Sequence, residues 1–303
     1  MKTSAAEIVA NAGLWSRLRD QVGAYVLLIK PGIVLLVTAT GLAAAVREGS
    51  LAAEPLRLAG VLLGIFLAAG AANGLNQFWD RDIDALMLRT RSRRPLPTGR
   101  IPPRAALRFA FVSGAAGLML LMTAGSGLAA VLGLATIAFY ILVYTLWLKR
   151  RTPLNIVIGG AAGAAPPLIG WAAGASELAM EPLLMFLVIF LWTPPHFWAL
   201  ALCTKEEYAR ASIPMLPVVA GEKRTRAAIA VSVALLLPAT AALGFSADLG
   251  WPFHAGTALL GLNLIRKVVR LHRQQDHPAA RELFGYSIVY LAGVFGLLVV
   301  PGW

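Results

Sequence analysis

The sequence predicts an all-α membrane protein, with nine transmembrane helices around a central cavity, the N-terminus in the cytoplasm and the C-terminus on the opposite side. Three observations lead to this fold class. The 303 residues are 58% hydrophobic and only 14% charged, whereas soluble proteins average about 25% charged residues. Nine apolar windows follow one another along the chain, and Lys and Arg gather in every second connection between them.

The apolar windows are long enough, or nearly long enough, to cross a bilayer as helices, which takes about 20 residues each. They cover residues 24–46, 57–79, 104–124, 127–148, 153–173, 182–203, 226–247, 249–265 and 283–303. Residues 1–22 are charged and contain neither an apolar signal core nor a small-residue cleavage site. We therefore expect an interfacial N-terminal segment over residues 1–22 and one transmembrane domain over residues 23–303.

The formal net charge of +12 reflects the topology of the chain. Of the 27 Lys and Arg residues, 24 lie in residues 1–22 or in every second connection. The exceptions are Arg47 and Arg57, in the alternate connections, and Lys30, inside the first window near its cytoplasmic end. Because Lys and Arg are retained on the cytoplasmic side, we expect a bacterial cytoplasmic membrane protein whose basic face needs no nucleic acid partner. The single cysteine, Cys203, excludes an internal disulfide.

Glycine and proline residues inside the windows predict close helix packing and kinks around a cavity. They are Pro31, Gly159, Gly160, Gly163, Pro166, Pro167, Pro194 and Pro195.

Carboxylates at the end of the second window predict a magnesium site. Asn76, Asp80 and Asp84 are spaced by four, so a continuing helix places them on one face over about 12 Å, while Asp82 points elsewhere. Oxygen ligands of this kind suit Mg²⁺, which usually takes phosphate oxygens and waters as its other ligands. The alternative is a solvated acidic helix end that pairs with nearby arginines.

A basic run follows the carboxylates, and guanidinium groups bind phosphate bidentately. Together the two segments predict a diphosphate site that faces the cytoplasm, although retention on the cytoplasmic side would also explain the charges. The candidate anion ligands are Arg89, Arg91, Arg93, Arg94, Lys149 and Arg150. Asn155 lies one turn inside the membrane, where its amide needs a partner, either a ligand phosphate or a neighbouring helix.

His196 lies about two turns inside the sixth window, beside two prolines and two tryptophans. It is a candidate substrate ligand, and the alternative is a histidine hydrogen-bonded within the bundle. Glu206 and Glu207 follow the same window and could form a second carboxylate pole opposite Asp80 and Asp84. Such a pole would hold a second Mg²⁺ across the diphosphate.

Four separated motifs resemble the UbiA-type intramembrane prenyltransferases, and within them the haem-directed branch. The motifs are Asn-Gln-Phe-Trp-Asp-Arg-Asp-Ile-Asp, Tyr-Thr-x-x-Leu-Lys-Arg, Ile-Gly-Gly-x-x-Gly-Ala-x-Pro-Pro, and Pro-His-Phe-Trp-Ala-Leu-Ala-Leu followed by Ile-Pro-Met-Leu-Pro. The resemblance covers the chain from about residue 30 to the last window. It implies nine helices around a lipid-open cavity, with metal and diphosphate at the cytoplasmic mouth.

The resemblance also implies a reaction. A farnesyl group would pass from farnesyl diphosphate to a vinyl group of haem B, and water addition would give haem O for haem-copper oxidases. Haem B is then a substrate and Mg²⁺ the cofactor, with haem A synthase or an oxidase assembly factor as a partner. The catalytic residues would be Asn76, Asp80, Asp84 and Lys149, and His196 would serve the haem.

One position departs from the family pattern, which has Asp before a tyrosine where this chain has Glu207 before Tyr208. The extra methylene leaves open whether Glu206 or Glu207 completes the second metal site, next to Tyr208 as a substrate-binding residue. Two other functions remain open at this point. One is prenylation of an aromatic quinone precursor, and the other is a transporter or lipid-binding protein that would need no Mg²⁺.

Overall fold

The computed structural model describes residues 5–300, so the first four residues of the expected N-terminal segment and the end of the last expected span lie outside the described residues. Within this range, eight helical segments are long and apolar enough to cross a membrane. They are α2 (Pro31–Glu48), α3 (Pro55–Trp79), α6 with η2 (Pro103–Leu120 and Leu121–Gly125), α7 with η3 (Gly127–Ala138 and Phe139–Leu148), α8 with α9 (Asn155–Ala164 and Pro166–Ala175), α10 (Met180–Cys203), α13 (Gly221–Ser246) and α15 (His277–Leu298).

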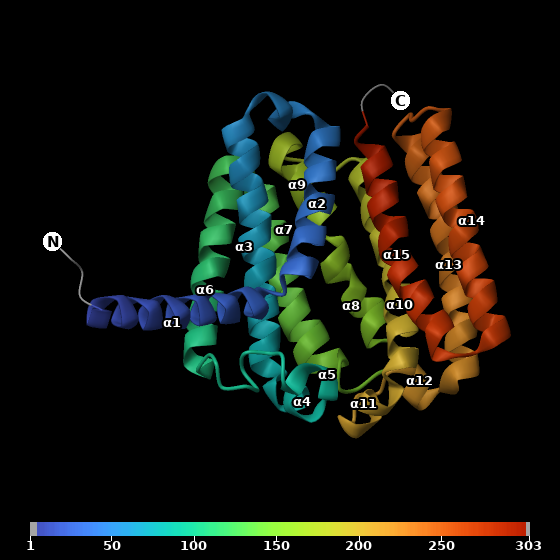
Figure 1. The fold of residues 1–303 in the computed structure, drawn as a ribbon. Coiled ribbons are helices and arrows are strands. Elements are labelled where there is room, and N and C mark those ends of the chain that lie inside the picture. The colour runs from blue at the N-terminus through green and yellow to red at the C-terminus, as the bar shows by residue number, and fades with distance from the viewer. Residues whose placement is uncertain (1–4, 301–303) are drawn as a thin grey trace.

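The eighth expected span corresponds to helix α14 (Trp251–Gln274), which is longer than the apolar window 249–265. Its C-terminal half carries Arg266, Lys267 and Arg270, and α14 is not one of the eight apolar segments. Figure 1 shows α14 running alongside α13 and α15 for most of their length. It packs as a full member of the bundle.

Helix α1 (Ala5–Ile29) lies across the bundle rather than along it (Figure 1). The first expected span is therefore divided, because residues 24–29 belong to α1 and the lengthwise helix starts at Pro31. Proline disfavours the α conformation in the residue before it, and Lys30 has a φ of 56°. Gln77 of α3 donates from Nε2 to the carbonyls of Leu27 and Leu28, at 3.1 and 2.7 Å, which satisfies acceptors that the end of α1 leaves free.

Short helices gather at one end of the bundle, which we call the polar end. They are α4 (Arg81–Leu86), α5 (Leu88–Arg91), α11 (Lys205–Arg210) and α12 (Leu216–Val219). The connections that follow α3 and α10 thus share one end, as the gathering of Lys and Arg in every second connection predicts. At the opposite end, η1 (Ser50–Ala53) joins α2 to α3.

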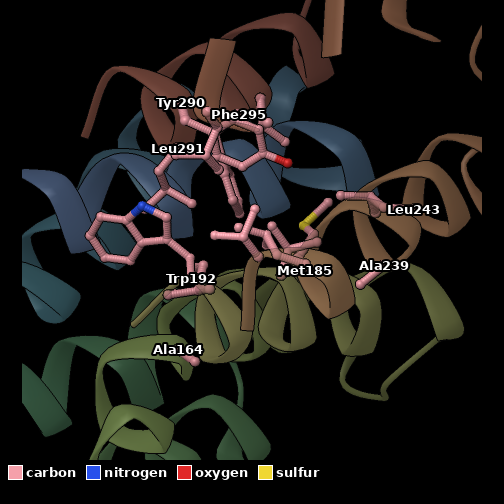
Figure 2. Packing of buried hydrophobic residues seen from close by; sticks show 14 of the residues in the cluster. Ala164, Met185, Trp192, Ala239, Leu243, Tyr290, Leu291 and Phe295 are labelled. Carbon is pink, nitrogen blue, oxygen red and sulfur yellow. The ribbon is translucent and has the colours of Figure 1, made fainter. Parts of the chain in front are cut away.

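Small residues and a large apolar cluster hold the helices together. A Cβ on Gly170 would lie 2.1 Å from the carbonyl oxygen of Gly41, so the backbones of α2 and α9 touch. Figure 2 shows Tyr290 and Phe295 of α15 above Met185 of α10 in the largest buried cluster. Large apolar side chains also cover the outer surface, among them Leu56, Phe111, Phe245 and Trp251. A surface of this kind suits contact with lipid rather than water.

A largely apolar cavity lies within the bundle, as the glycines and prolines of the sequence predict. Residues of α2, α3, α7, η3, α8, α9, α10 and α15 line it. Gly159, Gly160, Gly163 and Pro166 are among its lining residues. The chain also breaks between α8 and α9 at Ala165, directly before Pro166.

Candidate active site

The polar end of α3 carries the predicted face of oxygen ligands. Helix α3 ends at Trp79 and α4 begins at Arg81, yet the backbone N–H of Asp80 donates to the Asn76 carbonyl at 2.9 Å and that of Asp84 to the Asp80 carbonyl at 2.8 Å. This continuity keeps Asn76, Asp80 and Asp84 on one face. Asp80 and Asp84 are 0% and 2% exposed, whereas the Asp82 side chain is 60% exposed.

Cations from two other segments meet this face. The Asp80 carboxylate accepts a hydrogen bond from Asn76 Nδ2 at 2.8 Å and forms an ion pair with Lys149, while Arg94 forms an ion pair with Asp84. Burial raises the pKa of Asp84, and the charges of Arg94 and Lys149 oppose that shift. Carboxylates of the first motif thus pair with Arg94 of the basic run and with Lys149 of the second motif.

Lys30 is a member of the cluster that sequence reasoning assigned only to topology. Its Nζ donates to Asn76 Oδ1 at 2.9 Å. The signal for this role was present in the sequence, because a lysine inside an apolar window is costly unless it has a partner or a function.

A π-helical segment, η3, brings Lys149 to Asp80. The backbone N–H of Lys149 donates to the carbonyl of Tyr144, five residues earlier, at 2.9 Å. Thr145 donates from Oγ1 to the Tyr140 carbonyl at 2.8 Å, and it accepts a hydrogen bond from Asn76 Nδ2 at 3.1 Å. Segments of this kind often occur at functional sites. Sequence reasoning did not identify Thr145, because apolar periodicity does not distinguish a π-helix from an α-helix.

Several predicted anion ligands lie outside the cluster. Arg150 forms two hydrogen bonds with Asp82, at 2.8 and 2.9 Å, which hold the pKa of Asp82 below its usual value. The side chains of Arg89, Arg91 and Arg93 are exposed at the polar end. They remain able to reach a ligand, because no side-chain hydrogen bond or ion pair within the described residues fixes their position.

The predicted second carboxylate pole is split. Glu206 has an 87% exposed side chain and pairs with Arg210 at 3.4 Å, pointing into solvent. Glu207 faces α5, where its Oε2 accepts the backbone N–H of Arg89 at 3.2 Å. Tyr208 is buried in an apolar cluster with Ile83 of α4. Of the two glutamates, only Glu207 contacts the arginine-rich segment that follows Asp84.

The donor set fits a divalent ion that shares its ligands with a substrate. Asp80 Oδ1 is buried and has no hydrogen-bond partner in the described part of the chain. Among residues 5–300, no three His, Cys, Asp or Glu side chains form a closed metal cage. Mg²⁺ does not need such a cage, because it commonly takes one or two carboxylates together with phosphate oxygens and waters. Asn155 donates to the Thr152 carbonyl at 2.6 Å, and its buried Oδ1 is also without a partner among the described residues.

The cavity begins beside this cluster, with Asn73, one turn before Asn76, among its lining residues. Tyr140 and Tyr144 stack at 5.3 Å along one wall. The ring of Tyr144 fits there because residue 159 is glycine, since a Cβ would lie 2.2 Å from that ring.

His196 lines the same cavity and is 8% exposed. Its ring stacks on Trp192 at 4.4 Å and on Phe284 at 4.5 Å. Its Nδ1 lies 2.7 Å from Ser287 Oγ. The intramembrane histidine is therefore bonded within the bundle and also open to the cavity.

The model of the UbiA prenyltransferase family matches residues 34–303. The chain belongs to the UbiA prenyltransferase family. It is similar to the protoheme IX farnesyltransferase of Symbiobacterium thermophilum, with 48% identity over 89% of this chain and 91% of the relative. It is also 48% identical to the protoheme IX farnesyltransferase of Synechococcus elongatus, over 95% of this chain and 94% of the relative.

Solved structures share the fold of this chain at low sequence identity. A digeranylgeranylglyceryl phosphate synthase superposes with a TM-score of 0.75 at 18% identity, over 92% of this chain and 97% of that one. A UbiA homologue from Archaeoglobus fulgidus, bound to DMAPP and Mg²⁺, superposes with a TM-score of 0.69 at 17% identity, over 91% of this chain and 99% of that one. The resemblance drawn from the four motifs is thus confirmed at the level of the family.

Proposed function

We propose that the protein transfers a farnesyl group from farnesyl diphosphate to a vinyl group of haem B and adds water to give haem O. The observation that carries the proposal is the buried pair Asp80 and Asp84, joined to Lys149 and Arg94 at the mouth of an apolar cavity. Such an arrangement suits a substrate with a charged diphosphate and a long apolar tail. The haem acceptor follows from the relatives named protoheme IX farnesyltransferase.

At the mouth, Asp80 and Asp84 would hold Mg²⁺, with Asn76 beside them. When bound, the ion supplies charge neutralisation to the departing diphosphate. Lys149 and Arg94, displaced in part from their carboxylate partners, would then bind phosphate oxygens, and Lys30 would keep Asn76 oriented. The exposed side chains Arg89, Arg91 and Arg93, with Arg150, Asn155 and Tyr208, are the outer substrate ligands in this proposal, and Glu207 is favoured over Glu206 as a second carboxylate.

Inside the cavity, aromatic and apolar walls would keep water from the farnesyl cation and stabilise its charge. Tyr144 and Phe197 line the cavity. His196, deeper in the bundle, would face the haem rather than the diphosphate. In this proposal the diphosphate is bound at the mouth of the cavity, and the haem is bound deeper in the bundle near His196.

The same proposal includes the arrangement in the membrane. With α14 as a ninth span, the polar end and the N-terminus lie in the cytoplasm and the C-terminus lies outside, in a bacterial inner membrane. Helix α1 would lie at the interface. The division into an interfacial segment (1–22) and a transmembrane domain (23–303) remains part of the proposal, although α1 itself runs to Ile29. Haem A synthase or an oxidase assembly factor would receive the product.

Incubation of the purified protein with haem B, farnesyl diphosphate and Mg²⁺ tests the proposal. We expect a heavier, hydroxylated haem and one released diphosphate for each haem consumed, and no release after chelation of Mg²⁺. Substitution of an aromatic quinone precursor for haem B should give no prenylated product. If the protein binds farnesyl diphosphate but releases no diphosphate from it in the presence of Mg²⁺ and haem B, it would instead be a transporter or lipid-binding protein.

A further inference from the structure

Ser287 of α15 organises the surroundings of His196 through three hydrogen bonds. Its hydroxyl donates to the Phe284 carbonyl at 2.7 Å, and its oxygen lies 2.7 Å from His196 Nδ1. Its own carbonyl accepts the indole N–H of Trp192 at 2.6 Å. Ser287 and Trp192 are 2% and 6% exposed, so water does not compete for these bonds.

These contacts assign a tautomer to the imidazole. A serine hydroxyl has one hydrogen, and a carbonyl oxygen can only accept. Both contacts are therefore hydrogen bonds only when Ser287 donates to the Phe284 carbonyl and accepts from His196 Nδ1, which assigns the proton to Nδ1. In a neutral imidazole the other nitrogen then has a free lone pair. Within the described residues, Nε2 has no hydrogen-bond partner, and His196 lines the cavity.

The position of the ring is also fixed. Trp192 and Phe284 stack on its two faces at 4.4 and 4.5 Å. The cavity beside it is mostly apolar, so an acceptor nitrogen there is a specific feature. This nitrogen could accept a proton at a place in the cavity away from the diphosphate.

We propose that His196 Nε2 takes the proton from the water that ends the reaction, and that Ser287 is the positioning residue that keeps Nε2 unprotonated. This inference rests on the proposed function. As the C–O bond to diphosphate breaks, the vinyl π electrons form a bond to the first farnesyl carbon. The positive charge moves to the vinyl carbon attached to the macrocycle. Water oxygen bonds to that carbon, one of its protons passes to Nε2, and the hydroxyl remains on the product. The imidazolium then returns its proton to solvent or to the diphosphate.

Two variants test these roles by the nature of the product rather than its amount. His196→Phe keeps a ring between Trp192 and Phe284 but has no nitrogen, and Ser287→Ala removes the acceptor that holds the proton on Nδ1. Loss of a general base slows a step by about 10²-fold or more. We therefore expect the cation to lose a proton instead of capturing water, so that mass spectrometry detects mainly a farnesylated haem lighter by one water in His196→Phe and a mixture in Ser287→Ala.

The matched control is Tyr290→Phe, which removes another buried hydroxyl from α15, one bonded to Thr240 at 2.8 Å and not to His196. It should give the fully hydroxylated product. The inference is overturned if both test variants yield only hydroxylated product at any rate. It is also overturned if His196→Phe loses haem affinity, measured by the Soret band, at an unchanged product ratio, since His196 would then be an iron ligand. A wild-type protein that makes no prenylated haem would refute the proposed function instead.

Discussion

Lys30 Nζ donates a hydrogen bond to Asn76 Oδ1 at 2.9 Å, and this bond joins the break between α1 and α2 to the last turn of α3. Lys30 holds a φ of 56°, a conformation uncommon for residues other than glycine. Gln77, the next residue after Asn76, bonds to the end of α1 at the same place. The helix that lies across the bundle is thus connected directly to the carboxylate pole.

Replacement of Lys30 by methionine should lower kcat/KM by about 10- to 100-fold. The side chain keeps a similar length but loses its charge, and hydrogen bonds to charged groups contribute about 1.5–3 kcal/mol. Lys267→Met is the control, because Lys267 pairs with Glu282 at 2.5 Å on α14 and α15, outside the cluster. Equal losses in the two variants, measured as diphosphate release, would mean that Lys30 has only a general stabilising role.

Asp80→Ala and Asp84→Ala should each reduce turnover by about 10³-fold or more while the protein still inserts and folds. Their oxygens are proposed to hold the ion that neutralises the leaving group, an effect of several kcal/mol. Asp82→Asn is the control, since Asp82 is exposed and pairs with Arg150. Assays at limiting Mg²⁺ check this, and near-normal activity in both alanine variants would remove the metal hypothesis.

The sequence predicted that Asn76, Asp80 and Asp84 share one face, because helical spacing is a local property. Residues four apart share a face whatever surrounds them, so Asn76, Asp80 and Asp84 could be grouped without a structure. The roles of Lys30 and Thr145 could not, because each depends on a contact between distant segments.

The partners of charged residues near the cluster are also difficult to predict from the sequence. Arg150 and Glu206 are predicted ligands by their proximity in sequence, and in the structure they pair with Asp82 and Arg210. A charge at a helix end has several partners within reach of its long side chain, and the sequence does not rank them. In the fold, apolar length predicted eight segments that are long and apolar enough to cross a membrane. The break at Lys30 was missed, although Pro31 signals it, because the apolar window continues across the proline.

Labelling of single introduced cysteines, in a Cys203→Ser background, should separate the two ends of the bundle. Positions near Arg93 and Glu222 should react from the cytoplasmic side, and positions near Ser126 and Glu177 from the other side. The physical reason is that Lys and Arg in the polar-end connections are retained in the cytoplasm. Reaction of positions 93 and 177 from the same side, with an impermeant reagent on intact and inverted vesicles, would contradict the nine-span arrangement.

Thr145→Val should lower activity by about tenfold and raise the Mg²⁺ concentration needed for half-maximal rate. Valine has nearly the shape of threonine but no hydroxyl, so Asn76 Nδ2 loses one acceptor and the Tyr140 carbonyl loses its donor in the widened turn. Each buried hydrogen bond contributes about 1 kcal/mol.

The control for this variant is Thr123→Val, which removes a hydroxyl bonded to the Met119 carbonyl at 2.9 Å in the other π-helical segment, η2. The carbonyl of the neighbouring Ala124 accepts a hydrogen bond from Arg57 at the start of α3, whereas the carboxylates lie at the other end of α3. Loss of the Thr123 hydroxyl should therefore leave the Mg²⁺ dependence unchanged. Activity titrated against Mg²⁺ in both variants decides the matter. If Thr145→Val lowers the rate without shifting the Mg²⁺ midpoint, the threonine supports the helix but does not position Asn76 for the metal.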